Sequence, residues 1–181
     1  MILKHSGIND ILMVDSKGII SLSRNDLNKH KQSLATWTNF EQAEGALTTA
    51  LKGRDVFIGV SKADTLKPDM IKDMNNDPII FALANPNPEI LPEVAKQAGV
   101  RLIATGRSDF LNQVNNALAF PGIFRGALDN KVQNITLELQ VKAAHNLANL
   151  LTNPTEDKFI PSIFDERVME TVASSFTYVA P

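Results

Sequence analysis

Residues 56–105 decide the fold of this chain, and they read VFIGVSKADTLKPDMIKDMNNDPIIFALANPNPEILPEVAKQAGVRLIAT. Three short apolar runs in this stretch alternate with two segments of helical character. The apolar runs cover 56–60, 78–84 and 101–105, and the helical segments cover 68–74 and 92–98. Because no hairpin turn separates the apolar runs, the pattern predicts a parallel sheet covered by helices on both faces. The expected fold class is therefore α/β, a doubly wound parallel sheet of Rossmann type.

Polar residues follow the predicted strands at their carboxyl ends. Ser61 comes directly after the first run, Asn85 after the second and Gly106 after the third. Asp15 closes a further apolar run in the same way, DILMVD at 10–15. Since open α/β sheets bind ligands beyond the carboxyl ends of their strands, these positions together predict a nucleotide-type crevice.

Asp15 has two interpretations on the residues alone. In a doubly wound nucleotide-binding fold, an acid at the end of the second strand bonds the adenine ribose hydroxyls. A strand also ends in aspartate before a turn for purely local reasons, and here the turn Ser16-Lys17-Gly18 follows directly. The residues leave both interpretations open.

The phosphate-binding loop of such a fold has no counterpart in the sequence. The 9 glycines form no G-x-G-x-x-G. This loop lies about 20 residues before the ribose-binding acid, and Asp15 is closer than that to the first residue. We therefore expect residues 1–181 to form one domain that is incomplete at its N-terminus and lacks the first strand and the phosphate loop. Without that strand, we expect either that residues 1–50 detach or re-pair against the remaining strands, or that another chain supplies the missing edge, while 56–129 keeps its parallel order.

A second stretch, ATGRSDFLNQVNNALAFPGIFRGALD at 104–129, predicts a helix with two faces. The apolar face carries Leu111, Val114 and Leu118, and the neighbouring polar face carries Asn112, Asn115 and Asn116. Asparagine is a poor helix former, because its side chain competes for the backbone. Three asparagines on one face indicate a binding surface, although single asparagines often bond only their own backbone.

The ends of this predicted helix carry further signals. Asp109 can cap its start, and Arg107 with the free amides of the first turn would make a positive end suited to a carboxylate or phosphate. Pro121 lacks a backbone donor and should end or kink the helix. Other helices are predicted at 27–35, 43–51, 134–152 and 165–178.

The composition excludes several classes of function. A chain of 181 residues with 44% hydrophobic and 21% charged residues is long enough for one globular domain. A net charge of −2 without a basic run argues against nucleic acid as a partner, and no apolar run approaches the roughly 18 residues of a membrane helix. The chain has no cysteine, which fits a reducing cytoplasm, and its 3 histidines form no metal-ligand spacing.

The stretch at 104–129 resembles the nicotinamide-side segment of the bacterial malic enzymes. The resemblance extends upstream through DILMVDSKGII, ALKGRDVFIGVS and PIIFALANPNPEI and downstream to FIPSIFDERV, or roughly residues 9–172. It implies the NAD-binding domain of an NAD-dependent malic enzyme, which oxidises malate with NAD and decarboxylates the product to pyruvate. The full-length enzyme is expected to use a divalent metal, Mg²⁺ or Mn²⁺, and to form a homodimer.

The resemblance also implies roles for individual residues. Asp15 would contact the adenosine ribose, and its carboxylate would repel the 2′-phosphate of NADP. Ser61 would bind the cofactor, and Asn85 would bond the nicotinamide ribose and approach the substrate. Asn115 and Asn116 would hold malate, Asn116 also contacting the cofactor carboxamide. The catalytic tyrosine and lysine and the metal-binding acids of the family belong to an N-terminal domain without a counterpart here, so no catalytic or metal-binding residue is expected in this chain.

Two other functions remain open at this point. Decarboxylation of oxaloacetate within the same family needs no net hydride transfer, and sequence does not separate it from malate oxidation. A non-enzymatic NAD-binding or dimerisation module is the other alternative, because the catalytic domain has no counterpart. The chain by itself is expected to be inactive and to bind NAD weakly at best.

Overall fold

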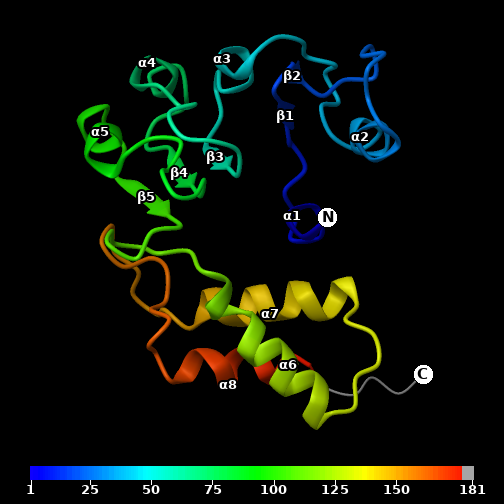
Figure 1. Ribbon diagram of the computed structural model, residues 1–181, viewed down its shortest axis with the longest axis vertical. Coiled ribbons are helices and arrows are strands. Elements are labelled where there is room, and N and C mark those ends of the chain that lie inside the picture. Colours follow the sequence, from blue (N-terminus) through cyan, green and yellow to red (C-terminus); the bar gives the residue numbers. More distant parts are fainter. Residues whose placement is uncertain (177–181) are drawn as a thin grey trace.

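The centre of the molecule is a parallel sheet of three strands. In the computed structural model, which describes residues 1–176, these are β3 (Val56–Gly59), β4 (Ile79–Ala82) and β5 (Leu102–Thr105). β4 lies in the middle, and the strands all run in the same direction (Figure 1). The predicted α/β fold with a parallel sheet is confirmed, and each strand lies within the apolar run that predicted it.

Helices cover one face of this sheet. α4 (Pro68–Ile71) connects β3 to β4, and α5 (Pro92–Gln97) connects β4 to β5. Both helices begin with proline in the first turn, where a backbone N–H would have no partner within the helix. Phe57, Ile80 and Ile103 are aligned across the three strands and form the buried core together with residues of these helices.

The opposite face of the sheet is covered only in part, which differs from the prediction. Phe81 contacts Phe159 edge to face at 6.2 Å, but Val56 and Ile58 of β3 remain 44% and 47% exposed. The strand order explains the difference. Right-handed crossovers between consecutive neighbouring strands place both connecting helices on the same face.

Residues 1–50 lie beside this sheet and do not pair with it. They form α1 (Ile2–His5), β1 (Val14–Asp15), β2 (Gly18–Ile19), α2 (Lys29–Ala35) and α3 (Leu47–Ala50). β1 and β2 pair with each other as an antiparallel hairpin. The predicted turn closes this hairpin, with Gly18 at a φ of 119° that glycine adopts readily. Asp15 therefore ends a short strand as expected, but the strand belongs to a hairpin that was not predicted.

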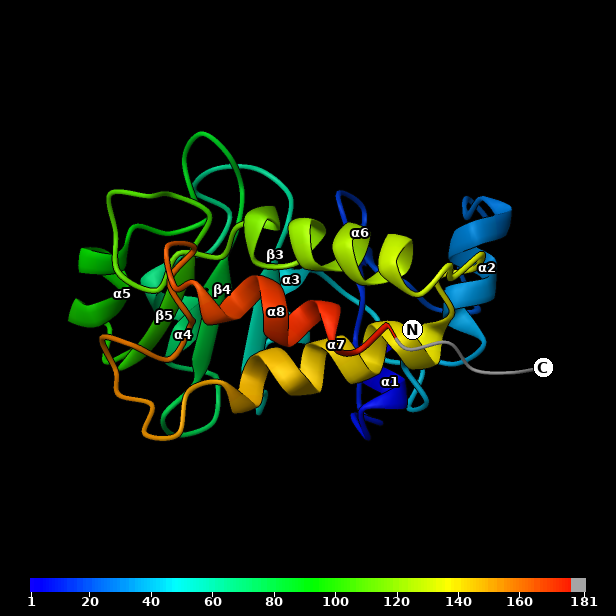
Figure 2. The ribbon, with the colours of Figure 1, turned by 90° about the horizontal axis from the view of Figure 1, so that it is seen from below.

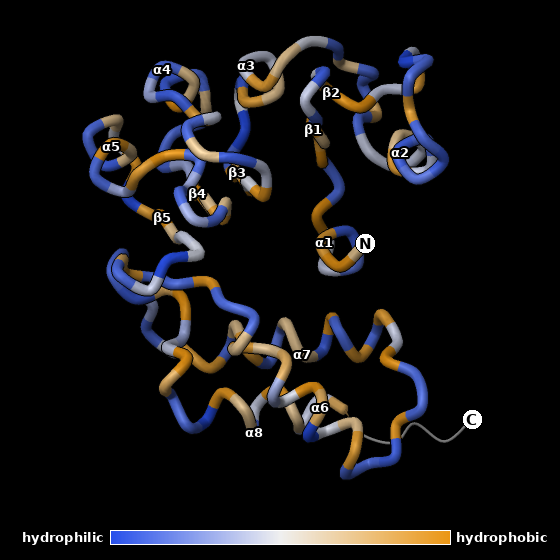
Figure 3. The backbone as a smooth tube through the Cα atoms, viewed as in Figure 1, coloured by the Kyte–Doolittle hydropathy of each residue, from blue (hydrophilic) through white to orange (hydrophobic). Residues whose placement is uncertain are grey.

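Three helices form a layer below the sheet in Figure 1. They are α6 (Phe120–Asp129), α7 (Leu137–Asn149) and α8 (Arg167–Ala173), and α8 lies between the other two (Figure 2). Hydrophobic and hydrophilic residues alternate along α7, as expected for a helix with one buried face (Figure 3). The predicted C-terminal helices are confirmed, although the end of the helix predicted at 165–178, with Tyr178, lies outside the described residues.

The stretch at 104–129 does not form the single helix predicted for it. After β5, Gln113 forms a parallel bridge with Thr105, and a short 3₁₀ helix, η1 (Asn116–Leu118), precedes α6. Leu111 is 59% exposed whereas Leu118 is buried, so the helically spaced leucines do not share a face.

Pro121 begins a helix and does not end one. It lies in the first turn of α6, where its missing donor and fixed φ favour helix initiation. Asn112 has a φ of 55°, a left-handed conformation that a helix does not tolerate and that asparagine adopts more readily than most residues. These two residues explain why the helical spacing was misleading.

None of the helices among residues 1–176 has the length and hydrophobicity that would let it cross a membrane.

Candidate nucleotide-binding site

The loops beyond β3 and β4 carry two of the predicted site residues. Ser61 follows β3 and Asn85 follows β4, and both residues are exposed. Because β3 and β4 are parallel neighbours, their carboxyl ends meet at the same edge of the sheet. The structure therefore brings the Ser61 and Asn85 loops together as predicted.

Glu89 joins these two loops, a role that was not predicted from the sequence. Its side chain is fully buried. The Ser61 amide donates to Oε1 at 2.8 Å, and the Ala84 amide donates to Oε2 at 3.0 Å. The one signal in the sequence is Gly59, because a glycine within a strand indicates close approach by another group. That group is the Glu89 side chain, whose Cδ would lie 2.4 Å from a Cβ at Gly59.

Arg107 connects the loop after β5 to the loop after β4. Its guanidinium pairs with the Asp109 carboxylate at 2.6 Å and donates to the Pro86 carbonyl and to Asn87 Oδ1, both at 3.3 Å. The hydrogen bonds from Arg107 lower the pKa of Asp109. Asp109 thus caps no helix, and the predicted positive helix end at Arg107 does not form, because no helix starts there.

The three asparagines of the stretch at 104–129 have different environments. Asn112 is buried against residues 156–160, away from the other two. Asn115 accepts a hydrogen bond from the Ala117 amide at 2.9 Å and so caps η1. Asn116 is exposed and, within residues 1–176, its side chain has no hydrogen-bond partner. The prediction of one face with three carboxamides is wrong, but two of them remain adjacent.

Asn115 and Asn116 follow a segment that runs along β5. The Val114 amide donates to the Thr105 carbonyl at 2.7 Å, beside the parallel bridge between Thr105 and Gln113. Because this segment continues in the direction of β5, Asn115 and Asn116 lie beyond the carboxyl end of that strand. They therefore lie at the same edge of the sheet as Ser61 and Asn85.

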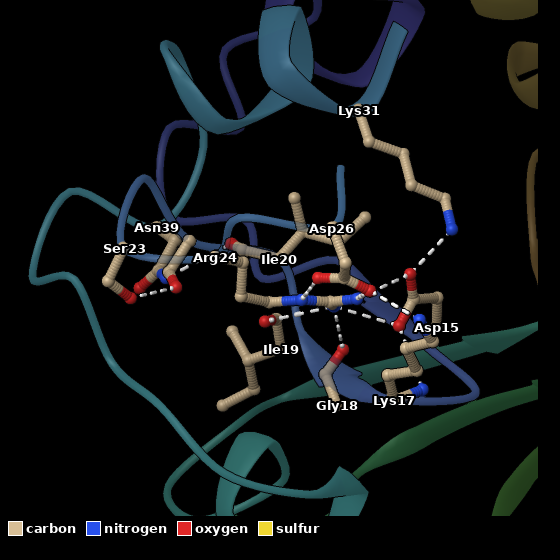
Figure 4. A network of polar contacts seen from close by, with 11 residues as sticks. Asp15, Lys17, Gly18, Ile19, Ile20, Ser23, Arg24, Asp26, Lys31 and Asn39 are labelled. Atoms are coloured by element: carbon tan, nitrogen blue, oxygen red, sulfur yellow. Dashed lines mark hydrogen bonds and ion pairs between the residues drawn. The ribbon is translucent and has the colours of Figure 1, made fainter. Parts of the chain in front are cut away.

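Asp15 is the centre of a charged network in the N-terminal hairpin (Figure 4). Its carboxylate accepts from Arg24 Nη1 at 2.8 Å, from Lys31 Nζ at 2.5 Å and from the Lys17 amide at 2.9 Å. Arg24 and Lys17 also pair with Asp26, each at 2.9 Å. The hydrogen bonds from Arg24, with those from Lys31 and Lys17, hold the pKa of Asp15 well below its usual range.

A polar cavity of about 330 Å³ lies next to this network. It is lined by Lys17, Ile19, Ser21, Ser23, Arg24, Glu44 and Gly45. Its hydroxyls and charged side chains suit a polar ligand such as a ribose better than an apolar ligand.

Replacing Asp15 with asparagine is expected to make stability less dependent on pH in acid. The folded-state pKa of Asp15 is depressed, so its charge stabilises the fold above the unfolded value of about 3.9, and this stabilisation is lost as the pH falls toward the folded value. The difference in melting temperature between wild type and Asp15→Asn should therefore shrink below about pH 4. Asp69→Asn, at a side chain that is 93% exposed, is the control. A difference that stays constant down to about pH 2 would contradict the assignment.

The fold and these loops define the class of the protein as a nucleotide-binding α/β domain. The malic enzyme NAD binding domain family matches residues 2–175, so the chain belongs to the malic enzyme family. It is 48% identical over 182 residues to the bifunctional malic/malolactic enzyme of Bacillus subtilis, covering 99% of this chain and 44% of that protein. It is 44% identical over 181 residues to the NAD-dependent malic enzyme of Geobacillus stearothermophilus, covering 99% of this chain and 38% of that protein.

Solved structures agree with this assignment. The NAD-dependent malic enzyme of Thermotoga maritima superposes with a TM-score of 0.90 at 44% identity, covering 96% of this chain and 46% of that chain. The malic enzyme of Pyrococcus horikoshii has a TM-score of 0.89 at 39% identity, covering 97% and 43%. The chain thus spans less than half the length of these relatives. It is an NAD-binding domain of Rossmann type from the malic enzyme family.

Proposed function

We propose that this domain binds the cofactor and part of the substrate in an enzyme that oxidatively decarboxylates malate to pyruvate with NAD. The observation that supports the proposal is the grouping of Ser61, Asn85, Asn115 and Asn116 beyond the carboxyl ends of β3, β4 and β5 in a domain of this family. Their hydroxyl and amide groups offer both donors and acceptors, as a nicotinamide carboxamide, a ribose and a substrate carboxylate require.

Each residue has a distinct task in this proposal. Asn85 bonds the nicotinamide ribose and approaches malate, and Ser61 contacts the cofactor from the neighbouring loop. Asn116 holds the carboxamide and a malate carboxylate, which it can do because its side chain is exposed and has no partner within residues 1–176. Asn115 donates to the substrate carboxylate from its side-chain NH₂ group, because its Oδ1 already caps η1.

The preference for NAD over NADP needs a different reason from the one that the sequence offered. Asp15 was expected to repel a 2′-phosphate, but Arg24 and Lys31 offset its charge in the structure. To bond a ribose, Asp15 would share its oxygens with these cations. The support for NAD is therefore the family match and the NAD-dependent relatives. NADP-dependent relatives match as well, such as that of Halomonas elongata at 37% identity over 94% of this chain and 44% of that protein. Comparing the activity of the complete enzyme with NAD and with NADP tests the preference.

The residues described here offer no group of three or more His, Asp or Glu side chains that could hold a metal ion. The proposal assigns the ligands of the divalent metal to the predicted N-terminal domain of the full-length enzyme. The part of this chain in the reaction is to position the cofactor and the substrate. We also propose that the complete enzyme has an N-terminal catalytic domain and a further strand beside β3. Its assembly as a homodimer and its location in the cytoplasm are part of the same proposal. The open edge of β3, with exposed Val56 and Ile58, supports the further strand.

In the complete enzyme, Asn116→Ala is expected to lower kcat/KM for malate by roughly 10- to 100-fold. Loss of a hydrogen bond to a charged group costs about 1.5–3 kcal/mol, and an exposed position leaves the fold intact. Steady-state NADH formation measures the effect, and the melting temperature should not change. Asn134→Ala, at another exposed asparagine, is the matched control. Wild-type kinetics in the Asn116 variant would reject the role.

Decarboxylation of oxaloacetate, which needs no net hydride transfer, is the second candidate. The Bacillus subtilis relative is named a bifunctional malic/malolactic enzyme, which favours this alternative over a non-enzymatic module. Parallel assays of carbon dioxide release and NADH formation separate the two reactions. Carbon dioxide and NADH formed at equal rates from malate support oxidative decarboxylation, whereas carbon dioxide release from oxaloacetate without NADH formation from malate supports the alternative.

A further inference from the structure

Glu89 is the most deeply buried acidic side chain of the site, with no exposed surface. A carboxylate loses much of its hydration when buried, so groups within the protein must replace the hydrogen bonds that water provided. Within residues 1–176, no lysine, arginine or histidine pairs with it. The compensation comes from main-chain N–H groups, one on each carboxylate oxygen.

These two N–H groups belong to different loops. Ser61 opens the loop after β3, with its amide 2.8 Å from Oε1 and its hydroxyl 3.5 Å from the same atom. Ala84, directly before Asn85, has its amide 3.0 Å from Oε2. A carboxylate accepts on both oxygens at once, whereas a glutamine of the same shape offers only one accepting oxygen. The two oxygens of the Glu89 carboxylate therefore match the two amide donors that they join.

Gly59 provides the space for this contact. A Cβ at this position would lie 2.4 Å from Glu89 Cδ and 2.6 Å from Oε1. Atoms do not approach this closely, so any larger residue at position 59 would displace the carboxylate from its two donors. Gly59, at the end of β3, thus leaves the space that the Glu89 side chain occupies.

We propose that Glu89 is a positioning residue that sets the spacing between the Ser61 and Asn85 loops. It does not touch the cofactor, because its side chain is fully buried. It orients the backbone segments from which Ser61 and Asn85 reach outward. The consequence for cofactor binding rests on the function proposed above, but the contact itself does not.

Amide hydrogen exchange in the ¹⁵N-labelled chain tests the contact. In Glu89→Gln, the amide of Ser61 or Ala84, whichever faces the new NH₂ group, should exchange at least about tenfold faster than in wild type, since a hydrogen bond to a charged acceptor is lost. Amides of β4 and β5 away from this contact should keep their protection. Glu93→Gln, which removes the same charge from an exposed position in α5, is the control and should change neither amide. Unchanged exchange at both Ser61 and Ala84 in folded Glu89→Gln would overturn the proposal.

A second variant covers the case in which Glu89→Gln does not fold. Gly59→Ala keeps the carboxylate but pushes it away, and should accelerate exchange at Ser61 and Ala84 by a similar factor. Acceleration spread evenly over β3, β4 and β5 would show a general loss of packing and would overturn the positioning role.

Titration with NAD separates this inference from the proposed function. In the complete enzyme, the amide resonances of Ser61 and Asn85 should shift with NAD, and Glu89→Gln should raise the concentration needed by about tenfold. Absence of any shift in wild type would remove the cofactor assignment and leave the exchange result to decide on Glu89. Equal NAD affinities of wild type and Glu89→Gln would show that the spacing of the two loops does not affect cofactor binding, and would refute the positioning role.

Discussion

Replacing Asn112 with alanine should lower the free energy of unfolding by about 2–4 kcal/mol, because several buried polar groups would lose their partners. Asn112 is only 8% exposed. Its Nδ2 donates to the Glu156 carbonyl at 2.7 Å, and its Oδ1 accepts from the Phe159 amide at 2.8 Å. Weaker contacts at 3.4 Å reach the Ile103 carbonyl and the Ile160 amide.

These contacts hold residues 156–160 against β5, so the loss should be cooperative. Phe159, whose ring contacts Phe81 of β4, should become mobile at the same time. Urea unfolding measures the free energy, and near-ultraviolet circular dichroism reports the packing of the rings.

Two further variants identify the cause of the loss. Asn112→Gly keeps the left-handed backbone at a φ of 55° but has no side chain, so it should remain strongly destabilised if the hydrogen bonds matter. Asn116→Ala removes an exposed asparagine and should leave stability unchanged. Full stability in Asn112→Gly would show that the backbone conformation, and not the side chain, is responsible.

A second large effect is expected at Gly126 in α6. In a helix exposed to solvent, replacing glycine with alanine stabilises by roughly 1 kcal/mol. At Gly126 the sign should reverse, because a Cβ would lie 2.4 Å from the Ala173 carbonyl oxygen and 2.9 Å from Phe176 Cβ. The contact is with backbone, which cannot rotate away, so Gly126→Ala is expected to destabilise by about 1–3 kcal/mol.

The close approach between α6 and α8 explains this expectation. Gly122, one turn earlier, would place a Cβ 2.6 Å from Val172 Cβ, so the two glycines together let the helices pack closely. Leu128→Ala, at a leucine of α6 that is 78% exposed, is the matched control and should change stability little. Thermal unfolding compares the three proteins. A Gly126→Ala protein more stable than wild type would show that α6 and α8 pack less closely than described.

The exposed face of α6 would not be altered by this change. Phe120 and Phe124 stack at 5.9 Å on the side away from α8, and both are more than half exposed. A loss of stability in Gly126→Ala can therefore be assigned to the contact with α8.

Local sequence determined the sheet and most of the helices. The runs that became β3, β4 and β5 are short, apolar and separated by proline-initiated helices, so the neighbouring residues alone specify the type of element. Their parallel order followed from the absence of hairpin turns and from short crossovers. The placement of Ser61 and Asn85 at one edge of the sheet was predictable for the same reason.

Only the tertiary structure decided the stretch at 104–129. The spacing of Leu111, Val114 and Leu118 fits a helix, yet Asn112 bonds to residues about 45 positions later in the chain, such as Glu156 and Phe159. Propensity for a helix changes the free energy by tenths of a kcal/mol per residue, whereas four hydrogen bonds from a buried side chain change it by several. The long-range contacts therefore prevail.

The charged and buried parts of the site depended on the tertiary structure as well. Asp15 was recognised as an acid after a strand, but its partners Arg24 and Lys31 follow it by 9 and 16 residues and meet it only when the hairpin and α2 fold. Glu89 was overlooked because an acidic residue in a proline-rich loop normally faces solvent. Its burial requires Gly59, 30 residues earlier, to leave room for the carboxylate, and two main-chain donors to replace water. A sequence specifies each of these residues, but whether a carboxylate is solvated, paired with cations or buried depends on which distant segments surround it.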